Sequence, residues 1–337
     1  MLLTNNFLLL TPVLGQEKVL TGHNLNLCNF HRIKKFDTTG KLIASWGEKG
    51  TANGQFLHPH EIAVDSTGNV YVTDEERQDV QKFGSNGTFI TKWGTPGNGK
   101  GEFSGKIEDI GIDHSDNVYV VDYGNNRIAK FDNNGKFITM WGSKGSGEGQ
   151  FDRPWGVAFD ASGNVYVTDQ RNDRIQKFNS NGTFISEWGT KGDGPGEFIH
   201  LHAIAIDSYG NIYVSDAREH SIIQKFDNNG KFITKWGSRG HQDGQFTEQH
   251  GIAFDSAGNV YVVDTGNFRI QKFSPDGHFL GKWGSEGTHA DQFLMPQDIA
   301  IDSNDNIYIS DVGDAHPEIS YIGKFLMENR NLTQSTC

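Results

Sequence analysis

The chain has 337 residues, of which 42 are acidic and 30 basic, for a formal net charge of −12. An acidic surface repels phosphate backbones and anionic lipid headgroups, so the composition argues against nucleic-acid and membrane partners. Only 35% of the residues are apolar and 42 are glycine, a balance that favours many short strands joined by tight turns over helices.

The first 29 residues form a leader that contains no copy of the repeat described below. Residues 7–15 (FLLLTPVLG) could be the core of a secretion signal, but no Lys or Arg precedes them and Pro12 interrupts them. An extracellular or cell-envelope location and a cytoplasmic one therefore both remain open. Cys28 and Cys337 lie near opposite ends of the chain without metal-binding spacing, and whether they pair is also open.

Residues 31–46 look like the second half of a repeat unit, with strand-like runs at 31–36 (HRIKKF) and 42–46 (LIASW). From there the dipeptide Trp-Gly recurs at spacings of 47 or 48 residues. Its six copies begin at Trp46, Trp93, Trp141, Trp188, Trp236 and Trp283. Such a period in constant phase is the signature of a repeat architecture.

One full unit shows what is repeated. Its strand-like runs are 155–160 (WGVAFD), 165–168 (VYVT), 174–178 (RIQKF) and 184–188 (FISEW). They are rich in Val, Ile, Phe and Tyr and are bounded by Asn, Asp, Ser and Gly, which is typical of β-strands joined by tight hairpins. Four antiparallel strands in each of six units predict an all-β, six-bladed β-propeller, because a single blade would expose both of its apolar faces.

The last unit has runs at 297–302, 306–309 and 322–325 but no Trp-Gly strand. The missing outer strand is present at 42–46, so we predict that this N-terminal strand completes the C-terminal blade and closes the ring. Either 31–36 or 322–325 supplies the third strand of that blade. The propeller domain is thus assigned to residues 30–326, and residues 327–337 to a tail.

The unit resembles the NHL repeat, and blade five shows the resemblance closely. The matching residues are Gly244, Phe246, Ile252, Ala253, Asp255, the segment Gly258-Asn259-Val260-Tyr261-Val262, Asp264, Asn267 and the segment Arg269-Ile270-Gln271-Lys272-Phe273. The resemblance covers roughly residues 30–325. It implies a six-bladed propeller and says little about function, because this fold serves many roles.

Residues that recur in every blade are expected to be scaffold. Two aspartates recur in each unit, one after the first strand (Asp65, Asp113, Asp160, Asp207, Asp255, Asp302) and one after the second (Asp74, Asp122, Asp169, Asp216, Asp264, Asp311). We expect them to accept backbone N–H bonds at turns, with Arg127, Arg174 and Arg269 as partners of the second set. Calcium binding in the Asp-Ser-x-Gly-Asn turns is the alternative.

Positions that break the symmetry are better candidates for a site. Five residues before each aspartate that closes the first strand lie His60, Glu108, Trp155, His202, His250 and Gln297. The first strand is the innermost, so these side chains should line the mouth of the central channel. Loops between the second and third strands bring Tyr123, Arg171 and Arg218 to the same face. Together these residues are the predicted ligand-binding site.

Three interpretations of this ring compete. Large polar side chains can simply fill a solvated opening, they can bind a macromolecule, or they can hold a metal. For the last, the ring resembles that of the peptidyl-α-hydroxyglycine α-amidating lyases, which implies zinc bound by His60, His202 and His250, calcium near Pro59-His60-Glu61, and a catalytic role for Tyr123. The resemblance is imperfect, because these histidines fall in blades one, four and five instead of alternate blades.

We therefore predict a non-enzymatic recognition or scaffold propeller that acts as a monomer and binds a protein, peptide or glycan at the channel mouth. No cofactor, no nucleic acid and no membrane is expected to bind. The alternative is a metal-dependent, lyase-like enzyme, with zinc or calcium as its cofactor.

Overall fold

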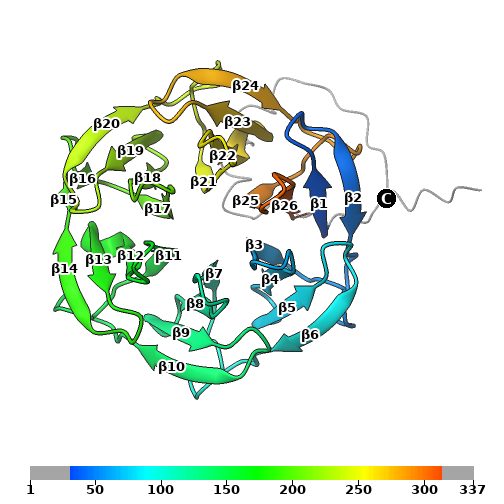
Figure 1. Ribbon diagram of the computed structural model, residues 1–337, viewed down its shortest axis with the longest axis horizontal. Helices are drawn as coiled ribbons and strands as arrows, with labels where there is room; N and C mark the ends of the chain where they lie inside the picture. The colour runs from blue at the N-terminus through cyan, green and yellow to red at the C-terminus, as the bar shows by residue number, and fades with distance from the viewer. Residues whose placement is uncertain (1–30, 313–337) are drawn as a thin grey trace, which may run out of the picture.

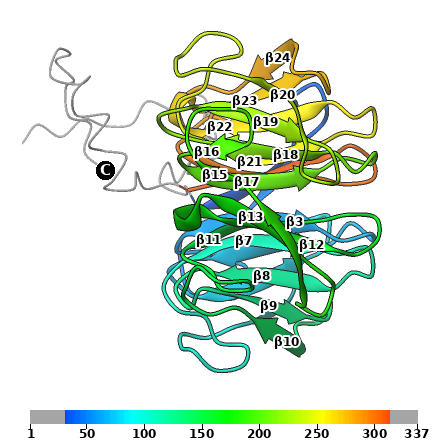
Figure 2. The same ribbon diagram turned by 90° about the vertical axis from the view of Figure 1, so that its left-hand side faces the viewer.

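The computed structural model describes residues 31–312, which form a ring of six four-stranded antiparallel sheets around a central channel (Figure 1). Figure 2 shows the same ring from its side. The leader, residues 322–325, the tail, Cys28 and Cys337 lie outside the described residues. Within residues 31–312 no helix is long and apolar enough to cross a membrane.

Five blades follow one another along the chain, each with its strands in sequence order from the channel outwards. Blade 1 comprises β3 (Pro59–Val64), β4 (Val70–Asp74), β5 (Asp79–Phe83) and β6 (Phe89–Trp93). Blade 2 comprises β7 (Ile107–Ile112), β8 (Val118–Asp122), β9 (Arg127–Phe131) and β10 (Phe137–Trp141). Blade 3 comprises β11 (Pro154–Phe159), β12 (Val165–Asp169), β13 (Arg174–Phe178) and β14 (Phe184–Trp188). Blades 4 and 5 comprise β17 (Leu201–Ile206), β18 (Ile212–Asp216), β19 (Ile222–Phe226), β20 (Phe232–Trp236); and β21 (Gln249–Phe254), β22 (Val260–Asp264), β23 (Arg269–Phe273), β24 (Phe279–Trp283). A short parallel pair, β15 (Thr190–Lys191) and β16 (Glu197–Phe198), lies in the connection between blades 3 and 4.

The sixth blade is built from both ends of the described chain, in the order β2-β1-β26-β25. Its strands are β1 (Arg32–Phe36), β2 (Leu42–Trp46), β25 (Pro296–Ile301) and β26 (Ile307–Asp311). β1 pairs with β26 in a register that sets Arg32 opposite Asp311 and Phe36 opposite Ile307. The predicted closure of the ring is confirmed, and the third strand of this blade comes from residues 31–36.

The core lies between the blades. The Trp that ends each outer strand contacts the third strand of the next blade, as Trp46 does with the Phe83 ring 6.2 Å away. The hairpin of that next blade turns at a glycine against the same indole. At Gly87 a Cβ atom would lie 2.7 Å from the Trp46 ring, and φ is +83°, so only glycine fits this turn without strain.

The aspartates after the inner strands are structural, as predicted. Asp65 accepts backbone N–H bonds from Thr67 and Asn69 and a hydrogen bond from the Tyr71 hydroxyl at 3.0 Å. Equivalent bonds recur in the other five blades. Each of these aspartates therefore holds a turn of its own blade and orients a buried tyrosine.

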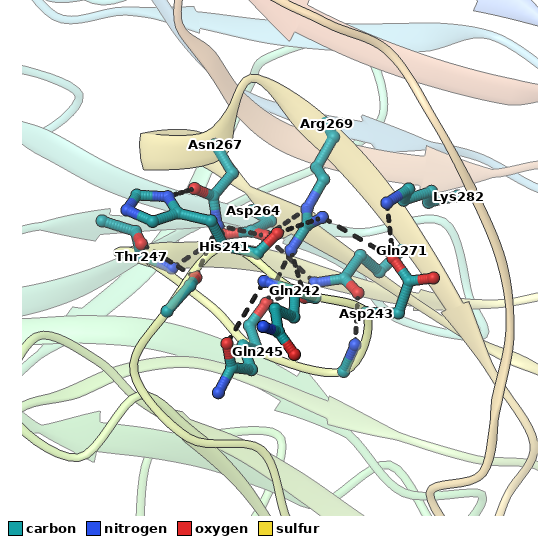
Figure 3. Close-up of polar contacts among 12 residues, drawn as sticks. His241, Gln242, Asp243, Gln245, Thr247, Asp264, Asn267, Arg269, Gln271 and Lys282 are labelled. Atoms are coloured by element: carbon teal, nitrogen blue, oxygen red, sulfur yellow. Dashed lines mark hydrogen bonds and ion pairs between the residues drawn. The ribbon is translucent and has the colours of Figure 1, made fainter.

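The second set of aspartates anchors the loops that precede the inner strands. In blade 5 the Asp264 carboxylate accepts bonds from the Thr247 N–H at 2.9 Å and from Arg269 Nε at 2.7 Å (Figure 3). The Arg269 guanidinium also donates to the carbonyls of Gln242 and Gln245. Arg127 and Arg174 bind Asp122 and Asp169 in the same way, so the predicted partnership is confirmed.

Candidate functional site

The six symmetry-breaking side chains all line one cavity of about 380 Å³ at the channel mouth. Each is the second residue of an innermost strand: His60 of β3, Glu108 of β7, Trp155 of β11, His202 of β17, His250 of β21 and Gln297 of β25. Five of the six are largely buried and Trp155 is partly exposed. The structure thus brings the predicted ring together at one level of the channel.

A break in strand pairing shapes this level. The pairing of β3 with β4 shifts between Pro59 and Ile62, so the Glu61 N–H bonds the Thr73 hydroxyl at 3.0 Å instead of the backbone. In blade 3 the Thr168 hydroxyl accepts from the Gly156 N–H and donates to the His202 carbonyl of blade 4 at 2.8 Å. The irregular backbone of the mouth is therefore satisfied by hydroxyls on the second strands.

Aromatic rings are packed together on one side of the mouth. The indole of Trp155 stacks on His202, with ring centroids 4.2 Å apart and planes 4° from parallel. His250 meets His202 edge-on at 5.0 Å, and the His60 ring lies 6.4 Å from His250. Tyr123 meets the Trp155 ring edge-on at 6.0 Å. These contacts restrict the rotamers of the rings and preorganise the site.

The three imidazoles are neutral at pH 7. Burial lowers the pKa of His60 and His202 well below the ordinary value of histidine, and it lowers the pKa of His250 to about 3. Each ring then offers one N–H donor and one nitrogen acceptor.

Charged side chains surround the imidazoles in pairs. Arg218 Nε lies 3.7 Å from Glu248, and Lys106 lies 3.3 Å from Glu75. Burial alone would raise the pKa of Glu75, but the hydrogen bond with His58 and the nearby Lys106 lower it. Arg239 and Glu219 complete the charged lining of the cavity.

Two predicted site residues are not among the cavity lining. Tyr123 reaches the site only through its contact with Trp155, and Arg153 covers its ring at 5.6 Å. Arg171 is exposed and its backbone N–H bonds the Asp152 carbonyl, while its charge still acts on Tyr123. Arg218, the third predicted loop residue, does line the cavity.

A second, smaller cavity of about 120 Å³ shares Glu108, Trp155 and His250 with the mouth. It contains Glu61, Asp109 and Asp298, whose carboxylate oxygens lie within 4.8 Å of one another. Among residues 31–312 these carboxylates, and not His60, His202 and His250, are grouped closely enough to hold one metal ion. In the sequence analysis Glu61 was named only as part of the Pro59-His60-Glu61 segment, and Asp109 and Asp298 were not found, although counting back four residues from the same aspartates finds all three.

Burial raises the pKa of all three carboxyls, and repulsion by neighbouring carboxyls adds to this effect at Glu61 and Asp109. The shift takes Asp298 to about 6 and carries Glu61 and Asp109 well above their usual range. Backbone N–H groups of neighbouring blades bind two of them, Val157 to Asp109 at 2.6 Å and Ile62 to Asp298 at 3.0 Å. Three carboxyls this close favour a shared proton or a bound cation over full ionisation.

Comparison with known proteins agrees with this architecture. Residues 66–141 and 156–225 match the model of a family described as a 6-bladed beta-propeller. The chain is thus a six-bladed β-propeller. Residues 250–273 match the model of the NHL repeat, in agreement with the resemblance of the repeat unit. No curated protein sequence matches the chain.

Several solved structures share the fold at low identity. A streptogramin B lyase is 15% identical with a TM-score of 0.57, over 85% of this chain and 96% of the lyase. A protein of unknown function from Bacteroides thetaiotaomicron is 19% identical with a TM-score of 0.62, over 84% of this chain and 74% of its own. A gluconolactonase from Xanthomonas campestris is 12% identical with a TM-score of 0.56, over 77% of this chain and 88% of the gluconolactonase. At such identities the likeness concerns the fold alone.

Proposed function

We propose that this protein is a non-enzymatic recognition propeller, which binds a segment of a peptide or glycan in the cavity at the channel mouth. One observation carries the proposal: the same position of six repeats holds different large polar side chains, and all of them line one cavity. The scaffold positions of the repeat, such as the two aspartates and the closing tryptophan, by contrast keep the same residue from blade to blade. Variation at the channel positions of a constant scaffold is what a binding site on a repeat protein requires.

Trp155 is the expected anchor of the ligand. It is partly exposed at the cavity, and His202 supports one face of its indole. Buried aromatic side chains of this kind contribute much of the affinity at recognition sites. The surrounding charges are largely paired with one another, which favours a polar ligand without a large net charge.

Trp155 also provides a direct test, since the other six of the seven tryptophans end outer strands. We expect ligands selected from peptide and oligosaccharide arrays to change the Trp155 fluorescence and to bind Trp155→Ala at least roughly tenfold more weakly. Tyr209→Ala, at a residue that is 86% exposed, is the matched control. Equal affinities of Trp155→Ala and wild type for every selected ligand would reject the mouth as the binding surface.

The second candidate function is a metal-dependent lyase-like enzyme that uses His60, His202 and His250. It is supported by the three neutral imidazoles that line one cavity, although they are not grouped closely enough in the structure to hold one ion and would have to move together to bind zinc. A virginiamycin B lyase from Staphylococcus aureus, 16% identical with a TM-score of 0.56, has a catalytically inactive His-to-Ala variant. Elemental analysis of protein purified without chelators separates the candidates: one zinc per chain, lost in His202→Ala, favours the enzyme.

A further inference from the structure

Blades 4, 5 and 6 present buried polar atoms to the mouth cavity that make no well-aligned hydrogen bond among the described residues, although the Gln297 side chain acts on His250 and the Gln249 backbone acts on His202. They are both ring nitrogens of His202, both ring nitrogens of His250 and the Oε1 atom of Gln297. These side chains are 1%, 9% and 2% exposed. A buried polar group without a partner destabilises a fold, so such a cluster beside a cavity indicates where a ligand supplies the missing partners.

The chemistry of these atoms restricts the ligand. A neutral imidazole has one donor and one acceptor, and the amide oxygen of Gln297 only accepts. A hydroxyl group both donates and accepts, so it can satisfy either nitrogen of His202 or His250 whichever of them carries the proton. A carboxylate or phosphate only accepts, and in this ring it would also lie beside the buried Glu108.

The charges that line the cavity balance. Lys106, Arg218 and Arg239 are basic, and Glu108, Glu219 and Glu248 are acidic. Since the imidazoles are neutral, a net charge on the ligand would be attracted to one set and repelled by the other. The lining therefore favours an uncharged ligand over an acidic or a basic one.

The aromatic wall supplies the remaining contact. A sugar ring carries hydroxyl groups around its edge and C–H groups on its faces, and such faces pack on indole and imidazole rings. Trp155 is partly exposed next to the unpartnered His202 and His250, so one sugar unit can contact all three.

We infer that the ligand of the mouth cavity is an uncharged sugar unit of a glycan, hydrogen-bonded by His202, His250 and Gln297 and packed against Trp155. The inference rests on the proposed function and narrows its ligand from peptide or glycan to glycan. It assigns the unpartnered polar atoms of blades 4 to 6 to the hydroxyls of the sugar.

The test is an array of uncharged and sialylated oligosaccharides beside an array of heptapeptides, followed by titration calorimetry on each oligosaccharide or peptide that binds. Four variants are compared with wild type. His202→Phe keeps a ring against Trp155 but removes its nitrogens, and Gln297→Met removes the amide of Gln297. Arg239→Ala removes one basic charge of the cavity lining and so distinguishes charged from uncharged ligands. Tyr209→Ala, at a residue that is 86% exposed and outside the cavity, is the matched control.

We expect an uncharged oligosaccharide to bind, to lose roughly five- to tenfold in affinity in each of the first two variants, and to be unaffected by Tyr209→Ala. Binding of peptides alone, with loss in Trp155→Ala, overturns the inference and leaves the proposed function standing. Binding of sialylated glycans alone, with loss in Arg239→Ala, also overturns it. If no probe binds in a Trp155-dependent way, the proposed function fails as well. Melting curves of each variant show whether it is folded.

Discussion

Two sets of carboxyls lie within the same blades, and they differ in the partners that surround them and in the causes of their pKa shifts. Asp264 represents the loop anchors: burial raises its pKa, while bonds from Thr247, Asn267 and Arg269 oppose that rise. Glu61, Asp109 and Asp298 represent the channel, where neighbouring carboxyls add to the effect of burial at Glu61 and Asp109. A buried carboxylate with a guanidinium partner stabilises the ring, whereas carboxyls that face one another make the channel sensitive to protons and cations.

Replacing the arginine that binds a loop-anchoring aspartate should have the largest effect on stability. Arg269→Met leaves Asp264, which is fully buried, without its guanidinium partner. We expect the free energy of unfolding to fall by about 3–5 kcal/mol, as measured by urea denaturation.

Arg239→Met, at an exposed arginine, is the control and should lie within about 0.5 kcal/mol of wild type. If Arg269→Met were equally mild, the neutral donors around Asp264 would suffice and the contrast between the two sets of carboxyls would disappear.

Replacing a channel carboxyl with a neutral amide should have a smaller effect on stability, and this effect should be stabilising. The pKa of Asp298 is raised to about 6 in the folded protein, so its carboxyl favours folding at acidic pH and that contribution is lost as the pH rises through about 6. Asp298→Asn keeps an acceptor for the Ile62 N–H. We expect the free energy of unfolding of the variant to exceed that of wild type by on the order of 2 kcal/mol at pH 8 in metal-free buffer and to equal it at pH 4.

Denaturation curves at both pH values, with Asp291→Asn as an exposed control, provide the measurement. A lower stability of Asp298→Asn at pH 8 would show that the ionised carboxylates are already stabilised in the folded protein.

The smallest expected effect on stability is in blade 4, where the side chain that binds the loop-anchoring aspartate is a histidine, which titrates near neutral pH. His220 replaces the arginine, and its nitrogens lie 2.5 Å from Asp216 and Asp193. Burial lowers the pKa of His220, but the bonds to both carboxylates raise it above the ordinary value. The protonated ring therefore stabilises blade 4 at pH 6, and this contribution is lost as the pH rises through the folded pKa.

Thermal melts at pH 6 and pH 8 should reveal this loss in wild type and not in His220→Gln. Its size should not exceed about 1 kcal/mol, because Asp193 is open to solvent. An identical pH dependence in the variant would assign the effect to other groups.

Features fixed by the phase of the repeat were predictable from the sequence. The strand at 42–46, the anchoring aspartates and the residues of the mouth ring follow from counting, because equivalent positions in a propeller lie at equivalent heights. Residues on connecting loops were not predictable in this way. Arg239, from the loop before β21, lines the mouth cavity and Arg171 does not, and the repeat period sets neither outcome.

The channel carboxyls were not grouped with one another in the sequence analysis, for another reason. Glu61, Asp109 and Asp298 break the symmetry as clearly as their neighbours, since the other three blades have Gly156, Ala203 and Gly251 at that position. Only the structure shows that carboxyls from three separate blades meet in one small cavity.

The shared blade also has a consequence for the order of synthesis. Lys34 bonds Asp311 across a separation of 277 residues, so the first strands of the ring wait for nearly the whole propeller before their partners exist. Until then β1 and β2 are a hairpin without a sheet, and a two-stranded hairpin is marginal by itself. The first hairpin of the described ring to be translated is thus the last to be placed. Ring closure cannot begin before β26 is made, and the high sequence separation of this pairing makes the step slow.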